Sequence, residues 1–220
     1  MRFQDRRQAG QRLAARLREW SAGGALVDPL VLALPRGGVP VAAEVARALG
    51  APLDVLVARK ICVPGHPETG IGAIVGDDPP LFDLRAVEML GLSEDQLGAD
   101  VARERTELRR RERLYRGDRS APRIEGRTVI VVDDGLATGA TARAALRHLR
   151  RRGPARLILA VPVGAPESAA EMRSEADDVI CLHQPPDFRA VGLWYADFDQ
   201  VGDEEVVRTL HGHSAAAGRG

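Results

Sequence analysis

Two adjacent acids followed by a run of small residues form the most informative part of this chain. Val129–Val132 are all β-branched, which predicts a strand buried on both faces. Asp133 and Asp134 follow at its carboxyl end, and Gly135–Thr141 lead into a helix expected over 142–151. Open α/β sheets bind ligands at such an edge, where small residues let main-chain N–H groups surround an anion. Paired acids suit ligand hydroxyl groups or a hard cation, so the segment favours a phosphorylated sugar.

A second turn, with one arginine and two glycines, follows another predicted strand. It separates a strand expected over 30–34 from a helix expected over 39–49, and its residues are Pro35, Arg36, Gly37 and Gly38. The glycines permit close approach of the main chain, and the guanidinium group can donate two hydrogen bonds to a phosphate. A turn with a purely structural role remains open.

The alternation of strands and helices predicts an α/β fold with a mostly parallel sheet and right-handed crossovers. Further elements are helices expected over 4–19 and 166–176, and strands over 52–60, 156–163 and 178–182. Arg59 and Lys60 end the strand over 52–60, and Lys60 is the single lysine among 31 basic residues. Either this place needs a compact, flexible ammonium group, or the lysine is a chance survivor in an arginine-rich composition.

Two features distinguish the middle of the chain. Residues 62–80 are rich in glycine and proline and predict a long loop with a short strand near 71–75, and such loops are usually functional or mobile. Residues 93–116 predict a charged helix that begins with a capping box. This helix could serve as a nucleic-acid arm, but the interspersed Glu104, Glu107 and Glu112 favour a solvated helix with ion pairs one turn apart.

The composition narrows the class of protein. A length of 220 residues with 45% hydrophobic and 28% charged residues fits one soluble globular domain. Zero net charge gives no general attraction to nucleic acid or a membrane surface, and no apolar run reaches the ~20 residues that span a bilayer. The beginning of the chain lacks the apolar core of a signal peptide. Cys62 and Cys181 have no metal or disulfide spacing, so we expect a cytoplasmic protein.

The segment from Val129 to Thr141 resembles the phosphoribosyl-pyrophosphate (PRPP) motif of type I phosphoribosyltransferases. The resemblance implies that Asp133 and Asp134 hold the ribose hydroxyl groups. It also implies a loop for the 5′-phosphate, formed by Ala137, Thr138, Gly139, Ala140 and Thr141. The chain departs from the family at Gly135, where an aliphatic residue is usual. The beginning of the chain, Arg2–Ala14, and the acidic loop are similar to those of uncharacterised bacterial members.

The resemblance also assigns roles to the basic residues. The turn Pro35–Gly38 resembles the family's pyrophosphate loop, and Arg36, Arg59 and Lys60 would supply positive charge to the leaving pyrophosphate. Mg²⁺ is the implied cofactor, held indirectly by Asp133 and Asp134 through ribose oxygens or water. The loop Ile61–Val75 would be a lid that excludes water from the reaction.

Members of this family select their acceptor base with a small hood after the last core strand. The segment from Asp187 to Phe198 holds four of the chain's eight aromatic residues, which either pack a hood core or include one that stacks on a base. Its similarity to hypoxanthine-guanine phosphoribosyltransferases implies base contacts from Phe188 and Asp197, although the spacing around Gly192 is longer. Trp194 is a further candidate to contact the base. Those enzymes carry an aspartate, the proposed general base, where this chain has Ala137.

The resemblance therefore predicts a type I phosphoribosyltransferase with a five-stranded, mostly parallel sheet, flanking helices and a hood. The expected division is a single domain over 1–212, with its core at about 25–62 and 126–184, a hood from 1–24 and 185–212, a lid and charged helix over 62–120, and a disordered tail over 213–220. The expected reaction transfers phosphoribose from PRPP to a purine-like or pyrimidine base in nucleotide salvage, with a homodimer as the expected assembly. The alternative is a regulatory protein that binds PRPP or a nucleotide without turnover.

Overall fold

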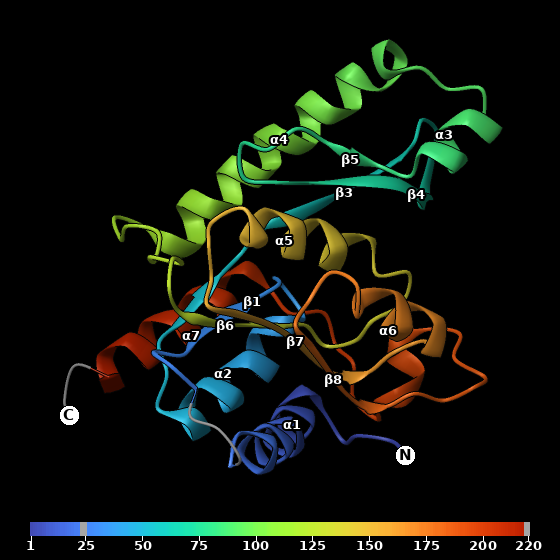
Figure 1. Ribbon diagram of the computed structural model, residues 1–220. Helices are drawn as coiled ribbons and strands as arrows, with labels where there is room; N and C mark the ends of the chain where they lie inside the picture. The colour runs from blue at the N-terminus through green and yellow to red at the C-terminus, as the bar shows by residue number, and fades with distance from the viewer. Residues whose placement is uncertain (23–25, 218–220) are drawn as a thin grey trace.

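The computed structural model describes residues 1–22 and 26–217, which form a central parallel sheet with a second, smaller sheet above it (Figure 1). The central sheet has the strand order β2–β1–β6–β7–β8, and all neighbouring strands in it are parallel. Its strands are β1 (Leu30–Ala33), β2 (Leu53–Val55), β6 (Thr128–Val132), β7 (Arg156–Val163) and β8 (Asp178–His183). The predicted α/β fold with a five-stranded parallel sheet is confirmed.

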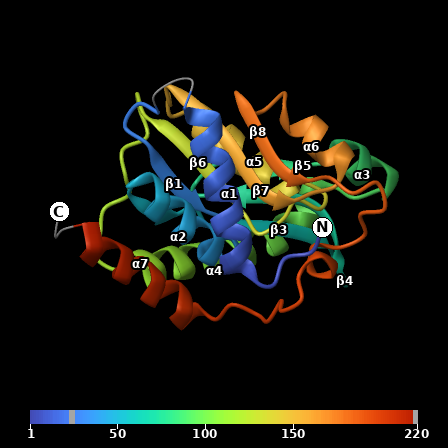
Figure 2. The same cartoon turned by 90° about the horizontal axis from the view of Figure 1, so that it is seen from below.

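Helices cover both faces of the central sheet. One face packs against α1 (Arg6–Ser21) and α2 (Gly38–Leu49), with α7 (Asp203–Ala217) beside α2, and Figure 2 shows α1 and α2 lying across it. The other face packs against α5 (Ala140–Arg150) and α6 (Pro166–Met172). Alternate strand residues divide between these two layers, since side chains along a strand point to opposite faces.

The smaller sheet differs from the sequence-based expectation. Its antiparallel strands are β3 (Ala58–Val63), β4 (His66–Val75) and β5 (Leu81–Phe82), followed by α3 (Leu84–Met89). The predicted strand over 52–60 is thus two strands in two sheets, and most of the predicted loop 62–80 is a hairpin. One apolar run covers both strands without a glycine or proline to mark the crossing, so local pattern could not divide it.

This smaller sheet, which we call the lid sheet, lies over α5. Ala73 and Val75 of β4 pack with α5, whereas Ile71 and Ile74 pack in the cluster that contains α4 (Glu94–Arg116). The capping box at Ser93 is confirmed, and Glu107 forms the expected ion pairs with arginines one turn away. Helix α5 is therefore enclosed between two sheets, with the lid sheet stacked over it (Figure 1).

The first and last helices of the chain both pack against the main core. Helix α1 buries Leu13 and Leu17 in the main core, and α7 buries Val206 and Leu210 there, so both helices belong to the core layers. The predicted tail is helical up to Ala217, because three alanines with high helix propensity extend α7, and residues 218–220 lie outside the described part. Among the described helices, none is long and apolar enough to cross a membrane.

Candidate functional site

The two turns predicted to bind ligand meet at the carboxyl edge of the central sheet. Strands β1 and β6 are direct neighbours, so the turn after β1 lies beside the acids after β6. A β-carbon on Gly37 would lie 2.0 Å from Oδ2 of Asp134, and one on Gly38 would lie 2.7 Å from the carbonyl oxygen of Val132. Only glycine fits at these two places, so the close approach expected from the sequence occurs, with the neighbouring acidic loop as its partner.

The turn after β1 is tied to both strands by main-chain hydrogen bonds. Leu34 N–H donates to Val132 O at 2.9 Å, and Gly38 N–H donates to Leu34 O at 3.1 Å. The peptide bond between Pro35 and Arg36 is cis. Helix α2 begins at Gly38, so the turn presents the N-terminus of a helix to the same space as the acids.

The two acids stand in a partly buried environment with little positive charge. Burial, and then the neighbouring charge of Asp134, raise the pKa of Asp133 well above its ordinary value. The pKa of Asp134 is also raised by burial, although Arg6 opposes that rise. The Oδ1 atom of Asp133 accepts a hydrogen bond from the N–H of Asp134 at 2.8 Å. A carboxylate pair of this kind is suited to ligand hydroxyl groups or a cation that would compensate its charge.

Arg6 is a residue of this site that the sequence analysis did not place there. Its Nε donates to Oδ2 of Asp134 at 2.8 Å, its Nη1 donates to Asp199 O at 2.7 Å, and its guanidinium carbon lies 3.9 Å from the centre of the Phe198 ring. Its neighbour Asp5 caps α1 by accepting from Gln8 N–H. The only sequence signal was the similarity of Arg2–Ala14 to related chains, because the partner acid lies 128 residues away.

The predicted phosphate loop forms the N-terminus of α5. Gly139 has φ +72° as the residue before the helix, a conformation that favours glycine. Ala137 O accepts a hydrogen bond from the hydroxyl group of Ser168 at 2.5 Å, and Leu136 is hydrogen-bonded to the chain after β7. The first N–H groups of a helix have no partner within the helix, so this fixed loop can bind an anion.

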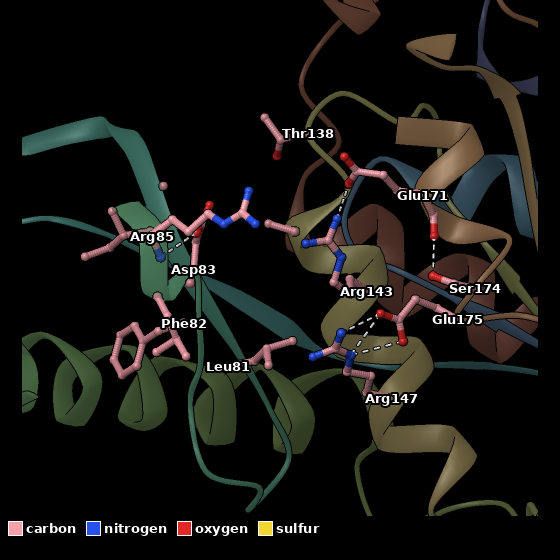
Figure 3. A pocket seen from close by; sticks show the side chains of 15 residues that line it. Leu81, Phe82, Asp83, Arg85, Thr138, Arg143, Arg147, Glu171, Ser174 and Glu175 are labelled. Carbon is pink, nitrogen blue, oxygen red and sulfur yellow. Dashed lines mark hydrogen bonds and ion pairs between the residues drawn. The ribbon is translucent and has the colours of Figure 1, made fainter. Parts of the chain in front are cut away.

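A cavity of about 780 Å³ separates the phosphate loop from the lid sheet (Figure 3). Thr138 and Ala140 line one side of it, and Gly70 to Gly72 and Leu81 to Arg85 line the other. Two ion pairs also line it: Arg143 of α5 pairs with Glu171 of α6, and Arg147 of α5 pairs with Glu175 in the turn after α6. Arg85 extends from α3 toward Arg143. Its volume is that of a pocket for a small ligand.

The predicted pyrophosphate residues are held by separate acids. Arg36 lies 3.7 Å from Oδ1 of Asp203, and Arg59 forms an ion pair of 2.6 Å with Glu104 of α4. Arg59 and Lys60 belong to β3 of the lid sheet, and thus do not end a strand of the central sheet as expected. The stem of Lys60 packs over Gly70, which lines the cavity. The turn that carries Arg36 therefore lies beside Asp133 and Asp134, whereas Arg59 and Lys60 lie on the lid sheet.

The segment predicted to select the base packs partly as an aromatic cluster. Tyr195 is fully buried against Phe3 and Phe198, with ring centroids 5.5 and 5.0 Å away, and its hydroxyl group donates to Asp134 O at 2.5 Å. A β-carbon on Gly135 would lie 2.5 Å from Val191 of the short 3-10 helix η1 (Val191–Trp194). The unusual glycine therefore lets this segment rest on the acidic loop.

The three predicted base contacts occupy different places in this segment. Phe188 is partly buried against the cluster, and Trp194 stacks edge-on against His183 with its centroid at 4.9 Å. The buried Nε1 of Trp194 has no hydrogen-bond partner among the described residues. Asp197 lines a separate crevice of about 220 Å³ with Arg6 and Asp199. The structure does not gather these three side chains into one pocket.

The described residues include no group of three or more His, Cys, Asp or Glu side chains that could hold a metal ion. Asp133 and Asp134 nevertheless offer hard oxygen ligands in a pair that carries excess negative charge. Mg²⁺ commonly binds one or two carboxylates and completes its shell with water and phosphate oxygens of a substrate. The donor set fits this ion only together with a bound ligand.

Comparisons with known proteins agree with these observations. A Mycobacterium tuberculosis protein provisionally named a phosphoribosyl transferase is 45% identical over 208 residues, covering 94% of this chain and 46% of that protein. The chain thus spans about half the length of the curated relatives it matches. A uracil phosphoribosyltransferase from Lactobacillus gasseri is 36% identical over 84 residues, 37% of this chain and 40% of that protein.

A solved structure is similar over nearly its whole length. The crystal structure of a Thermus thermophilus protein superimposes with a TM-score of 0.79 at 43% identity, covering 96% of this chain and 98% of that one. The family model described as the phosphoribosyl transferase domain matches residues 4–195, which include both turns, the acids and the lid sheet. The chain belongs to the phosphoribosyl transferase domain family.

Proposed function

We propose that this domain transfers 5-phosphoribose from PRPP to a nitrogenous base and releases pyrophosphate. The observation that carries the proposal is the contact of Gly37 and Gly38 with Asp134 and Asp133. It joins a candidate pyrophosphate loop to candidate ribose acids. These parts would have to be adjacent to hold the two sides of the bond that breaks in PRPP.

Each part of the site has a proposed role. Asp133 and Asp134 accept hydrogen bonds from the ribose hydroxyl groups, and the loop Ala137–Thr141 binds the 5′-phosphate. The turn Pro35–Gly38, with the guanidinium group of Arg36, binds the pyrophosphate. Arg59 and Lys60 would act from the lid sheet, and the position of the Lys60 stem over Gly70 at the edge of the cavity supports this role.

The proposed reaction exchanges one bond at the anomeric carbon of the ribose. The bond from this carbon to the pyrophosphate oxygen breaks, and its electron pair leaves with pyrophosphate. A nitrogen of the base bonds to the carbon and loses its proton. Positive charge from Arg36, Arg59 and Lys60 stabilises the leaving group, and the lid sheet excludes water that would hydrolyse PRPP. Ala137 offers no proton acceptor, so another group or the base itself must manage that proton.

We propose Mg²⁺ as the cofactor, bound together with the substrate. Asp133 and Asp134 would hold it through ribose oxygens or water, as their carboxylate chemistry favours. When bound, the ion supplies positive charge to the pyrophosphate oxygens, and the chain's own residues orient the ribose beside it.

The acceptor would bind beneath the segment from Phe188 to Phe198, which we call the hood segment. Val191 and Tyr195 of this segment contact the acidic loop, and Arg6 of α1 lies between Phe198 and Asp134, which supports this placement. We retain Phe188, Trp194 and Asp197 as candidate base contacts. The partial similarity to a uracil phosphoribosyltransferase makes a pyrimidine the first acceptor to try. A free base as acceptor would place the domain in nucleotide salvage in the cytoplasm, and we expect a homodimer.

The test is calorimetric titration with PRPP and Mg²⁺, followed by measurement of pyrophosphate release with uracil, hypoxanthine, guanine and adenine. Binding with release for one base would establish the transferase and its acceptor. Binding without release for any base would favour the alternative, a regulatory domain that binds PRPP or a nucleotide. The absence of PRPP binding would refute both.

A further inference from the structure

A buried tyrosine of α4 holds the first residue of α7. Tyr115 is fully buried, and its hydroxyl group donates a hydrogen bond to Oδ1 of Asp203 at 2.5 Å. Nη2 of Arg110, also in α4, donates to the other oxygen of Asp203 at 3.3 Å. Asp203 is therefore fixed in position between two elements, although its own side chain is 28% exposed.

The same carboxylate faces the candidate pyrophosphate loop. Nη1 of Arg36 lies 3.7 Å from Oδ1 of Asp203, the oxygen that also accepts from Tyr115. The distance describes a loose ion pair between a partly exposed guanidinium group and a fixed acid. Arg36 follows β1 whereas Asp203 begins α7, so this contact joins the site to the outer layer of the fold.

We propose that Asp203 is a positioning residue that holds Arg36 in the ligand-free protein and competes with pyrophosphate for its guanidinium group. The proposal rests on the proposed function, because it assigns Arg36 to the pyrophosphate. An arginine side chain makes its strongest, bidentate contact with one anion at a time. When pyrophosphate binds, Arg36 must exchange Asp203 for the phosphate oxygens, and Tyr115 keeps Asp203 in place to take the arginine back.

Two observations support this exchange. The hydrogen bond from Tyr115 lowers the pKa of Asp203, so that the acid is charged at neutral pH and can attract Arg36. Arg59, the second arginine proposed to bind pyrophosphate, is also paired with an acid. Its partner Glu104 lies in α4, the helix whose Tyr115 holds Asp203. Acids held on or by α4 therefore neutralise two of the basic groups assigned to the leaving group.

The test is calorimetric titration with inorganic pyrophosphate and Mg²⁺. Asp203→Asn keeps an oxygen that accepts from Tyr115 but removes the charge that competes for Arg36. We expect pyrophosphate to bind this variant about two- to fivefold more tightly than the unchanged protein, the range for loss of one partly exposed ion pair. In an Arg36→Gln background the same substitution should give no gain. Asp203→Ser removes the same charge and serves as the second variant if thermal unfolding shows that Asn disturbs the fold.

The matched control is Asp178→Asn. Asp178 also pairs with an arginine, Arg156, at 2.8 Å, but it begins β8 at the opposite edge of the sheet. Unchanged or weaker binding by the Asp203 variants would overturn the proposal, as would an equal gain in the control or a gain that persists without Arg36. If the unchanged protein binds neither pyrophosphate nor PRPP, the proposed function itself fails, which is a different result from binding without a gain.

Discussion

Gly37 lies against the carboxylate of Asp134 so closely that a β-carbon at residue 37 would be 2.0 Å from Oδ2. The two residues are 97 positions apart in the chain, and adjacent parallel strands bring them together. The contact leaves no space for a side chain between the main chain of one loop and the acid of the other. A ligand bound by both loops would therefore be held by two rigid strand ends.

This contact predicts that Gly37→Ala damages the site more than the fold. The added methyl group must displace Asp134, and overpacking of this kind costs about 1–3 kcal/mol. Because Asp134 is the group that moves, PRPP affinity should fall by at least about tenfold, and calorimetry measures it. Gly98→Ala is the control: Gly98 lies in α4 with nothing within 4 Å of its added carbon, so we expect unchanged affinity and about 0.5–1 kcal/mol of added stability.

The packing of Val191 on Gly135 predicts a compensating pair of substitutions. Gly135→Ala should push Val191 away, since the added carbon would lie 2.5 Å from it, and should lower the melting temperature. Val191→Ala removes the obstructing methyl groups, so the double variant should melt closer to the unchanged protein than Gly135→Ala does. A double variant in which the two losses simply add would show that the hood segment does not rest on Gly135.

Removal of Arg6 should destabilise the protein through Asp134. The pair is largely buried, with 12% and 14% of the two side chains exposed, and loss of one partner leaves an uncompensated carboxylate. We expect Arg6→Met to lower the free energy of unfolding by about 3 kcal/mol in urea titrations. Arg7→Met changes the exposed neighbouring arginine and should cost less than about 0.5 kcal/mol. Equal losses in the two variants would contradict the structural role assigned to Arg6.

His148 predicts a loss of stability in mild acid. This buried residue of α5 lies with Nδ1 2.5 Å from Oδ2 of Asp78, in the turn between β4 and β5. Burial lowers the pKa of His148 below its ordinary 6.5, although Asp78 opposes that effect. The unfolded chain therefore binds the proton more readily, and stability falls as the pH drops from 7 toward 5, by at most about 1.4 kcal/mol per pH unit. The pKa of Asp78 is lowered, so its contribution is lost only at more acidic pH.

Urea titrations at several pH values test this expectation. His148→Gln should flatten the dependence of stability on pH between pH 7 and 5, and His211→Gln serves as the comparison variant at an exposed histidine. The pKa of His183 is also lowered by burial, so it contributes in the same direction and remains in both variants. If the free energy of unfolding changes with pH equally in the unchanged protein and in His148→Gln, another group causes the loss of stability.

The fold was accessible from local sequence, but several contacts of the site were not. Three parts of the site are contiguous in the chain: the strand that ends at Val132, the acids after it and the helix that follows. The spacing of apolar residues and the residue types therefore predict them together. Of the lid sheet only the short strand near 71–75 was predicted, and it lies in β4. The rest was missed because β3 continues an apolar run that begins in the central sheet. The partners of Arg6, Arg36 and Arg59 come from distant elements, and residue type alone cannot say which acid an arginine will meet.

The glycines show the same division. The sequence indicated that Gly37 and Gly38 permit close approach, but only the structure identifies what approaches them. Gly135 was noted only as a departure from the family, and the structure shows that it makes room for Val191. In both cases the sequence shows where the small residue is, but only the tertiary structure shows which residue packs against it.

The most direct test of the account is calorimetric titration of PRPP with Mg²⁺ into the unchanged protein and into Asp133→Asn and Asp134→Asn. Each substitution keeps the shape of the side chain. It replaces the charged carboxylate, whose oxygens would accept hydrogen bonds from the ribose hydroxyl groups, with a neutral amide. The account predicts that the unchanged protein binds PRPP and that each variant binds about tenfold or more weakly, as expected for loss of a hydrogen bond to a charged group. Equal affinity in all three proteins would contradict the assignment of these acids to the ribose.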